Sequence, residues 1–220
     1  LRLAGKKVPS LPGVDFTLEQ TWQFGHVETV VQQGAAASNP IQAFAGAWGL
    51  GYTFSDVSWS PRVGYQYAFA SGDEDPDNGA DKTFNQLYPT GHARLGYIDF
   101  HGYQNIRAHK AMLTLKPTKK LLMKADLWFF EADEEADDWI SVAGGVNRQG
   151  GDIYQNRKGT GNIDDEYGQE LDITLKYKLF KNFGVVAGYS HYFAGDFMED
   201  TNNGSDRDSD WAYLMTSLKF

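Results

Sequence analysis

Apolar and polar side chains alternate along several separate stretches of the chain. In residues 62–69, for example, every second side chain is apolar or aromatic: Val63, Tyr65, Tyr67 and Phe69. A period of two places such side chains on one face of a β-strand, and helical spacing fits none of the stretches. The pattern predicts about eight strands, at residues 15–25, 42–54, 62–69, 109–116, 121–130, 171–178, 183–193 and 211–220. The faces of 183–193 stay ambiguous, because Gly188 and Ser190 sit beside Tyr189 and His191.

The connections between these strands alternate between short and long. Short ones are expected at 56–60, 117–120 and 180–182, and long polar ones at 26–40, 71–106, 132–167 and 195–210. An up-and-down order of strands puts every long connection at the same end of the sheet. Outer-membrane β-barrels have this asymmetry, with short periplasmic turns and long extracellular loops. Both chain ends are then expected on the periplasmic side.

Aromatic residues gather towards both ends of the predicted strands. Those at the loop end are Tyr67, Phe69, Phe129, Phe130, Tyr192 and Phe193, and those at the turn end are Tyr52, Phe54, Trp59, Phe180, Phe183 and Phe220. Two aromatic girdles suit the two interfaces of a bilayer. We therefore predict an all-β fold, an antiparallel transmembrane β-barrel, whose apolar outer face meets lipid and needs no covering layer. The alternative is a soluble β-sandwich or lipocalin-like barrel, in which the aromatic residues pack in a core.

The composition restricts the function. Asp and Glu number 29 against 20 Lys and Arg, a net charge of −9, which argues against a nucleic-acid partner. The chain has no cysteine, which excludes a disulfide scaffold and a thiolate metal site and suits passage through an oxidising periplasm. The longest nearly apolar run, 43–52, is far shorter than the roughly 20 residues of a spanning helix. The chain begins at Leu1 without a signal-peptide pattern, so we expect a mature or truncated form.

The last predicted strand alternates and ends in Phe220. This ending resembles the final strand of bacterial outer-membrane barrels. In those proteins the terminal aromatic residue implies recognition by the barrel-assembly machinery, which we therefore expect as a partner. The expected location is the bacterial outer membrane.

A more specific resemblance lies in the second long connection. It contains Phe-Asn-Gln-Leu-Tyr-Pro-Thr-Gly-His at 84–92, followed by Gly-Tyr-Ile-Asp-Phe at 96–100 and Gln-Asn-Ile at 104–106. With the preceding stretch 67–77, which runs into Ser-Gly-Asp, this block resembles the alginate export family of outer-membrane porins. The resemblance implies a barrel of about 18 strands, enough for an aqueous channel. Residues 1–220 would then form one barrel domain that is incomplete at the N-terminus, with 1–5 as the end of an earlier strand.

The strand number decides between two functions. Eight strands that close on themselves leave an interior just filled by side chains, whereas about 16 to 18 leave a channel. If the eight predicted strands were the whole barrel, the protein would be a small structural or adhesive barrel that acts through its loops. If they are part of a larger barrel, it is a porin.

The face opposite the apolar one carries the charges that would line the channel. We predict as pore-lining residues Glu19, Arg62, Lys110, Lys116, Lys124, Asp126, Asp172, Lys176, Lys178 and Lys219. Basic residues outnumber acidic ones in this set, and a ring of Lys and Arg favours anions. The predicted function is passage of an anionic polysaccharide such as alginate, or of a small acidic solute, through a basic lumen. A general porin is the alternative, since lumen charges can also pair across strands.

The acidic loops invite a calcium interpretation, through Asp73, Asp75 and Asp77 or through the alternate carboxylates at 206–210. Neither stretch has the glycine and the final glutamate of a helix–loop–helix calcium site, so solvated loop charge is the default interpretation and no metal site is predicted. The chain has no nucleophile elbow, no His-Glu-x-x-His and no phosphate loop. Its five histidines, His26, His92, His101, His109 and His191, show no ligand spacing. We expect no enzyme activity and no cofactor; a hydrolase built at the loop end is the remaining catalytic alternative.

Overall fold

The structure is a computed structural model, and it describes residues 1–5, 8, 10–31, 35–75, 79–89, 94–148, 163–201 and 207–219. Regular structure in these ranges is almost entirely β. The strands are β1 (Arg2–Gly5), β2 (Val14–Val31), β3 (Ala35–Thr53), β4 (Arg62–Ala70), β5 (Ile106–Leu115), β6 (Leu121–Glu131), β7 (Trp139–Ile140), β8 (Val146–Arg148), β9 (Glu166–Lys178), β10 (Phe183–Ala194) and β11 (Ser209–Leu218). One short helix, α2 (Asp196–Thr201), follows β10. No helix among the described residues is long and apolar enough to cross a membrane.

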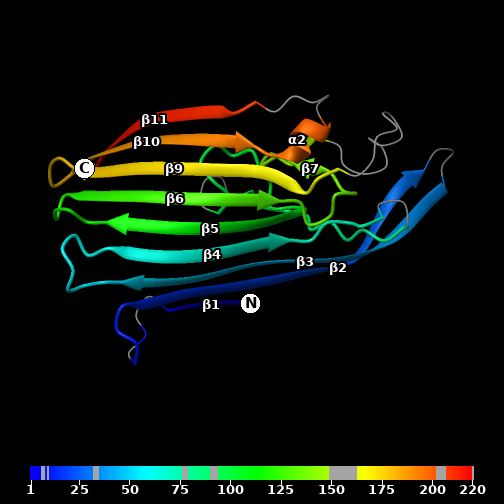
Figure 1. The fold of residues 1–220 in the computed structure, drawn as a ribbon. Coiled ribbons are helices and arrows are strands. Elements are labelled where there is room, and N and C mark those ends of the chain that lie inside the picture. Colours follow the sequence, from blue (N-terminus) through cyan, green and yellow to red (C-terminus); the bar gives the residue numbers. More distant parts are fainter. Residues whose placement is uncertain are drawn as a thin grey trace.

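Nine strands form one antiparallel sheet in the order β1-β2-β3-β4-β5-β6-β9-β10-β11, and β7 and β8 form a separate pair. The all-β antiparallel prediction is confirmed, and each of the eight predicted strands is present. The ninth strand of the sheet, β1, is the stretch at the start of the chain that was expected to end an earlier strand. Figure 1 shows the short turns at one end of the sheet and the long connections at the other, as the spacing of the strands predicts.

The first predicted long loop, 26–40, is wrong. β2 and β3 continue through it and pair from Val14↔Tyr52 to Val31↔Ala35. The hairpin extends past its neighbour, because β4 pairs with β3 only as far as Ala45↔Ala70, and it bends away from the sheet in Figure 1. The stretch lacks an apolar alternation, yet its β-branched valines and threonine favour a strand. Strand pairing here needs only the backbone.

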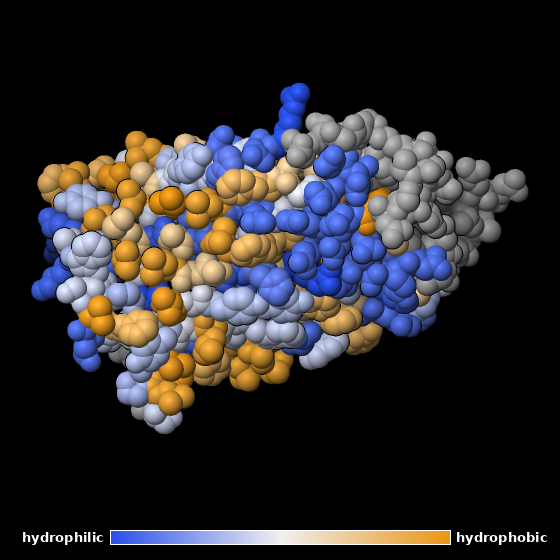
Figure 2. Space-filling view, in the orientation of Figure 1, coloured by the Kyte–Doolittle hydropathy of each residue, from blue (hydrophilic) through white to orange (hydrophobic). Residues whose placement is uncertain are grey.

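The two faces of the sheet differ as the alternation predicts. The predicted aromatic girdle at the loop end is wrong for Phe130 and Tyr192, which are fully buried on the inner face. Large apolar side chains project from the outer face, among them Trp48, Tyr65, Leu113, Ile173 and Leu214. The inner face carries small or polar side chains that are buried, among them Ala45, Ala68, Ala108, Asp126 and Ser190. Figure 2 shows apolar residues over the strands and hydrophilic residues gathered towards the loop end. The ambiguous strand is settled: Ser190 and Tyr192 of β10 lie on the inner face, buried.

Glycines on the strands make room for side chains that lie flat across the sheet. An added Cβ at Gly51 of β3 would collide with the Arg62 guanidinium, and one at Gly188 of β10 would collide with the Tyr213 ring. The ring of Tyr213 therefore lies across its neighbour strand and reaches Thr174 of β9, with 3.2 Å between the two hydroxyl oxygens. Such contacts tie three adjacent strands together and fix their register.

The core lies at the loop end of the inner face, under the folded connections. Trp128, Phe130, Tyr167 and Tyr192 of β6, β9 and β10 are fully buried there and pack with Phe197 of α2. Phe84, Leu95, Trp139 and Ile163, which lie in the described parts of the two longest connections, belong to the same cluster. In the described part of the chain β1 and β11 each pair on one side only, so the sheet is open. The described strands thus form an open sheet and not the small closed barrel of the structural or adhesive alternative.

Candidate channel wall and lysine cluster

The predicted pore-lining charges of β5 and β6 pair with one another. Lys110 Nζ lies 2.9 Å from Asp126 Oδ2, and Lys124 Nζ lies 3.1 Å from the same oxygen. The Lys110 ammonium also lies 4.3 Å from the centre of the Trp128 ring. Lys110 and Asp126 are 7% and 6% exposed. Two lysines thus share one carboxylate, and the buried one is held by both an ion pair and a cation–π contact.

Asp172 of β9 lies beside this group but accepts hydrogen bonds from neutral donors. The indole Nε1 of Trp128 donates to it over 3.0 Å, and the hydroxyl of Ser190 over 2.5 Å. Glu170, one inward position further along β9, is fully buried. The wall at this level therefore holds acidic as well as basic groups.

Arg62 and Glu19 also have partners on the inner face. The Arg62 guanidinium donates to both carboxylate oxygens of Asp15, over 2.8 and 2.7 Å. The Glu19 carboxylate lies 2.7 Å from Arg94 Nη2 and 3.6 Å from Arg2 Nε. Arg94 comes from the connection between β4 and β5, which here folds onto the wall.

Asp15, Arg94 and Glu170 also belong to the wall, although they are not among the predicted pore-lining residues. Asp15 and Glu170 stand in the same alternating register as Glu19 and Asp172, so the period of two already marked them. Arg94 lies in a connection, and no periodic signal marks it. With these three residues included, the middle of the wall is largely compensated rather than basic.

The turn end of the same face is different. Lys116, Lys176 and Lys178, with Lys119 and Lys120 of the β5–β6 turn, line a hollow of about 600 Å³. All five are exposed, and none forms an ion pair within the described ranges. We call these five residues the lysine cluster. Lys219 follows β11 at the same end, outside this hollow, where its backbone N–H donates to the Asn182 carbonyl.

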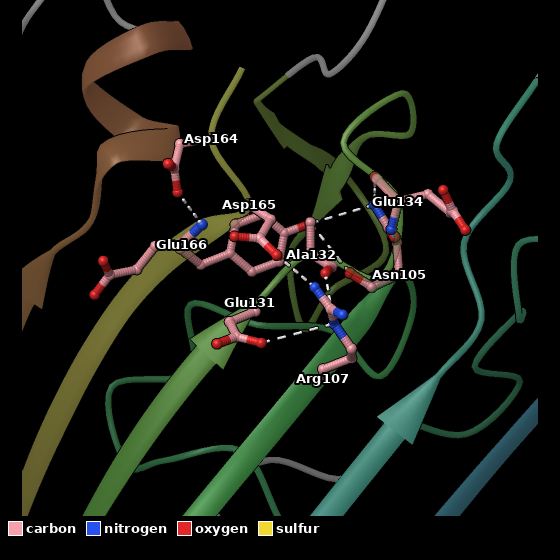
Figure 3. A network of polar contacts seen from close by, with 9 residues as sticks. Asn105, Arg107, Glu131, Ala132, Glu134, Asp164, Asp165 and Glu166 are labelled. Atoms are coloured by element: carbon pink, nitrogen blue, oxygen red, sulfur yellow. Dashed lines mark hydrogen bonds and ion pairs between the residues drawn. The ribbon is translucent and has the colours of Figure 1, made fainter. Parts of the chain in front are cut away.

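A polar network holds the base of the loop end together (Figure 3). Arg107 of β5 donates to the Ala132 carbonyl over 2.9 Å and to Asp165 over 2.5 Å, and it lies 3.7 Å from Glu131. The Asn105 amide donates to the Glu134 carbonyl over 3.0 Å. One strand end thus binds the two ends of the connection between β6 and β9.

The acidic residues of the loops serve mainly as hydrogen-bond acceptors. Asp73 is 4% exposed and accepts from the backbone N–H groups of Asp75 and Lys82, while Asp137 accepts from the Thr83 hydroxyl and the Asp73 N–H. Burial raises the pKa of Asp137 and of Asp133.

The calcium candidates do not form a site in the described residues. Among these residues no three acidic or histidine side chains gather as metal ligands, and Asp77 and Asp206 lie outside the described ranges. Asp208 accepts from the backbone N–H of Ala194, and Asp210 contacts His191 over 2.9 Å. The carboxylates at 206–210 are therefore engaged with β10 as far as the structure describes them.

The histidines lie apart from one another. His109 and His191 are on the outer face, beside Tyr65 and Asp210 respectively, and His92 lies outside the described ranges. His101 is buried against Phe130 and Trp139, with ring centres 4.1 and 5.0 Å away. Burial alone lowers the pKa of His101 to about 3, and neither ring nitrogen has a hydrogen-bond partner in the described structure. A neutral imidazole packed among aromatic rings acts here as a packing element.

Comparison with known proteins agrees with the resemblance in the sequence. A sequence model of the alginate export family matches residues 1–212. None of the curated proteins matches the chain significantly. The match spans β1 to β10 and the first residues of β11. The chain therefore belongs to the alginate export family, whose members are outer-membrane transport β-barrels and not enzymes.

Proposed function

We propose that this protein, embedded in the outer membrane, passes an anionic polysaccharide of the polyuronate class through its lumen. The lysine cluster carries the proposal, because it is the place on the inner face where basic residues stand without acidic partners in the described structure. Lysine suits a passing polymer, since its hydrated ammonium on a flexible stem attracts carboxylates as a point charge and does not clamp them. Each sugar could then exchange from one lysine to the next.

The cluster lies at the turn end, which the topology of such barrels assigns to the periplasm. A polymer that leaves the cell meets this end first. A basic mouth raises the local concentration of a polyanion and speeds its capture, and this effect weakens as salt screens the charges. The compensated wall beyond the cluster would let the chain slide without trapping it.

A general porin is the second candidate, and the paired charges of the wall favour it. Arg62, Lys110 and Lys124 all lie within 3.1 Å of a carboxylate oxygen. A wall built this way has little net preference for anions. The partners expected from the sequence divide in the same way: an acidic polysaccharide for the first candidate and small acidic or neutral solutes for the second. Outer-membrane lipid and the barrel-assembly machinery are expected for both.

Planar-bilayer conductance of the full-length protein separates the two candidates. We expect an anion-selective current that oligouronate blocks when it is added to the turn side. Lys176→Glu should weaken both the block and the anion preference, whereas Lys181→Glu should leave both unchanged. Lys181 is the matched control, because it lies in the β9–β10 turn but does not line the hollow. An unselective current that is indifferent to oligouronate would support the general porin.

A further inference from the structure

The segment 94–103 of the β4–β5 connection crosses the inner face of the sheet, and we call it the strap. At its start Arg94 pairs with Glu19 of β2. Three residues later the ring of Tyr97 stacks on Tyr213 of β11, with ring centres 4.7 Å apart and planes 8° from parallel. The segment passes behind β9 and β10 in Figure 1.

These two contacts show that the strap runs directly from β2 to β11 across the inside of a curved sheet. β2 is the second strand of the sheet and β11 the ninth, so seven spacings of about 4.8 Å, about 34 Å, separate them along the sheet. Three residues of extended backbone span only about 10 Å. The side chains cover the remaining distance only if the sheet curves round the strap. The strap therefore occupies space that the curved wall encloses.

Glu170 holds the strap from the middle of the wall. Its Oε1 accepts hydrogen bonds from the backbone N–H groups of Tyr97 and Ile98, over 2.5 and 3.0 Å. The carboxylate is fully buried, and its other oxygen has no partner in the described structure. Because one acceptor oxygen binds two successive amides, it holds the backbone of the strap at a fixed place on β9.

Gly96 allows this approach. It has a φ of +86°, and an added Cβ would lie 2.5 Å from Glu170 Oε2. A side chain here would thus meet both backbone strain and the carboxylate. At the far end of the strap, the Tyr103 hydroxyl donates to the Gly46 carbonyl of β3, and its N–H donates to Gln86 over 2.6 Å. The strap is fixed at both ends and in the middle.

We propose that the strap is the constriction of the channel and that Glu170 is the residue that positions it. The proposal rests on the proposed function only in so far as the protein is a channel, whatever its solute. The strap narrows the lumen and places the Arg94–Glu19 pair, with Arg2 beside it, in the path of the solute. It thereby limits the width of the polymer that can pass and adds one excess positive charge at that point.

The test compares three substitutions on β9 in single-channel recordings in plain salt, combined with hydrogen exchange of the strap amides. Glu170→Ala removes the oxygen that accepts both hydrogen bonds, which should shift the strap from docked to released by about tenfold or more. The strap amides should then exchange faster and the single-channel conductance should rise. Glu170→Gln keeps an acceptor oxygen of the same shape and should restore most of both. Glu166→Ala, on the same strand but without contact to the strap, is the matched control and should behave as the wild type.

Gly96→Ala tests the proposal from the other side, because its methyl group pushes the strap off Glu170 without changing the wall. It should raise conductance as Glu170→Ala does, and it serves if Glu170→Ala does not fold. Faster exchange with unchanged conductance would show that the strap lies outside the conducting path and would overturn the proposal. Unchanged exchange would overturn the role of Glu170. Block by oligouronate tests the proposed function separately, so either idea can fail without the other.

Discussion

The two ends of the inner face are built from the same strands but differ in burial: the loop end is packed and the turn end is exposed to solvent. At the loop end, the wall is packed: aromatic rings, an unpartnered histidine and a buried carboxylate lie under folded connections, and Arg107 finds acidic partners. At the turn end, the lysine cluster surrounds an open hollow. Burial forces charges to pair, because an unpaired ion away from water is costly. Only the hydrated end can keep charges free for a solute.

This comparison changes the meaning of a basic inner face. Counting residues along the alternating strands gives an excess of lysine and arginine, but the excess is not evenly spread. The wall between the two ends contributes Asp15, Asp126, Glu170 and Asp172. A channel built this way would attract a polyanion at one end and restrict its passage near the other.

The largest expected loss of stability comes from a substitution at the packed loop end, and it tests whether this end is a packed core. Phe130→Ala removes a fully buried ring that stacks on His101 and Trp128, and it should lower the free energy of unfolding by about 3–5 kcal/mol. Phe129→Ala is the control, because the ring of Phe129, the next residue on the same strand, points outward and is 39% exposed. Denaturant unfolding in lipid vesicles measures both. Equal losses would mean that the loop end is not a packed core.

The next effect concerns the compensated wall. Asp126→Ala leaves the buried Lys110 ammonium without its carboxylate, which should lower the free energy of unfolding by about 3 kcal/mol. The double variant Lys110→Met, Asp126→Leu should recover most of the loss, because it removes both charges at similar volume. The same denaturant titration applies. A stable Asp126→Ala variant with stronger anion selectivity would instead show that water reaches Lys110.

Docking of the strap onto the inner face of the sheet should depend on pH through His101, which is part of the strap. Its pKa is about 3 when buried and about 6.5 when released, so the released form binds the extra proton. Docking should therefore be fully favourable above about pH 6.5 and should weaken by up to tenfold per unit as the pH falls towards about 3. Hydrogen exchange of the strap measures it. Tyr167 and Tyr192 face His101, and the ordinary pKa of a phenol, about 10, lies above this range.

Two loop carboxylates act in the opposite sense. Burial raises the pKa of Asp133 and Asp137. Their contribution to the stability of the docked loops is therefore fully present below the pKa of the unfolded state, and it is lost as the pH rises through the pKa of the folded state. His101→Phe separates the two effects, since it keeps an aromatic ring and removes the basic nitrogen. The variant should lose the weakening at low pH. An unchanged pH profile would show that His101 does not control docking.

The strands could be predicted from the sequence because their cause is local. A period of two in residues such as Val63 and Tyr65 needs no knowledge of the partner strand. The prediction failed in the hairpin at 26–40, where backbone pairing alone extends the strands, and β7, β8 and α2 were not foreseen within the long connections. Family membership was recognisable from the block at 84–106.

The sequence predicted which charged residues face inward, but not which of them form ion pairs. Alternation placed Lys110, Asp126 and Asp172 on the inner face, but it could not show which of them are paired. Pairing depends on the register between strands, such as Gln66↔Lys110 or Met112↔Asp126. The strap was not predictable at all, because Arg94 reaches Glu19 across 75 positions of sequence. Connections carry no periodic signal that tells where they fold.

The smallest expected change in stability comes from removing charges at the exposed turn end. Lys119→Ala with Lys120→Ala removes two exposed charges of the lysine cluster, so the free energy of unfolding should change by less than about 0.5 kcal/mol. Capture of oligouronate should nevertheless slow, and the rate should become less sensitive to salt, because fewer charges steer the polymer. The frequency of blocking events at two salt concentrations measures this, with Lys181→Ala as the control for a turn lysine outside the hollow. A capture rate equal to that of the control would place the entry point elsewhere, whereas slower capture at unchanged stability would separate function at this end from packing at the other.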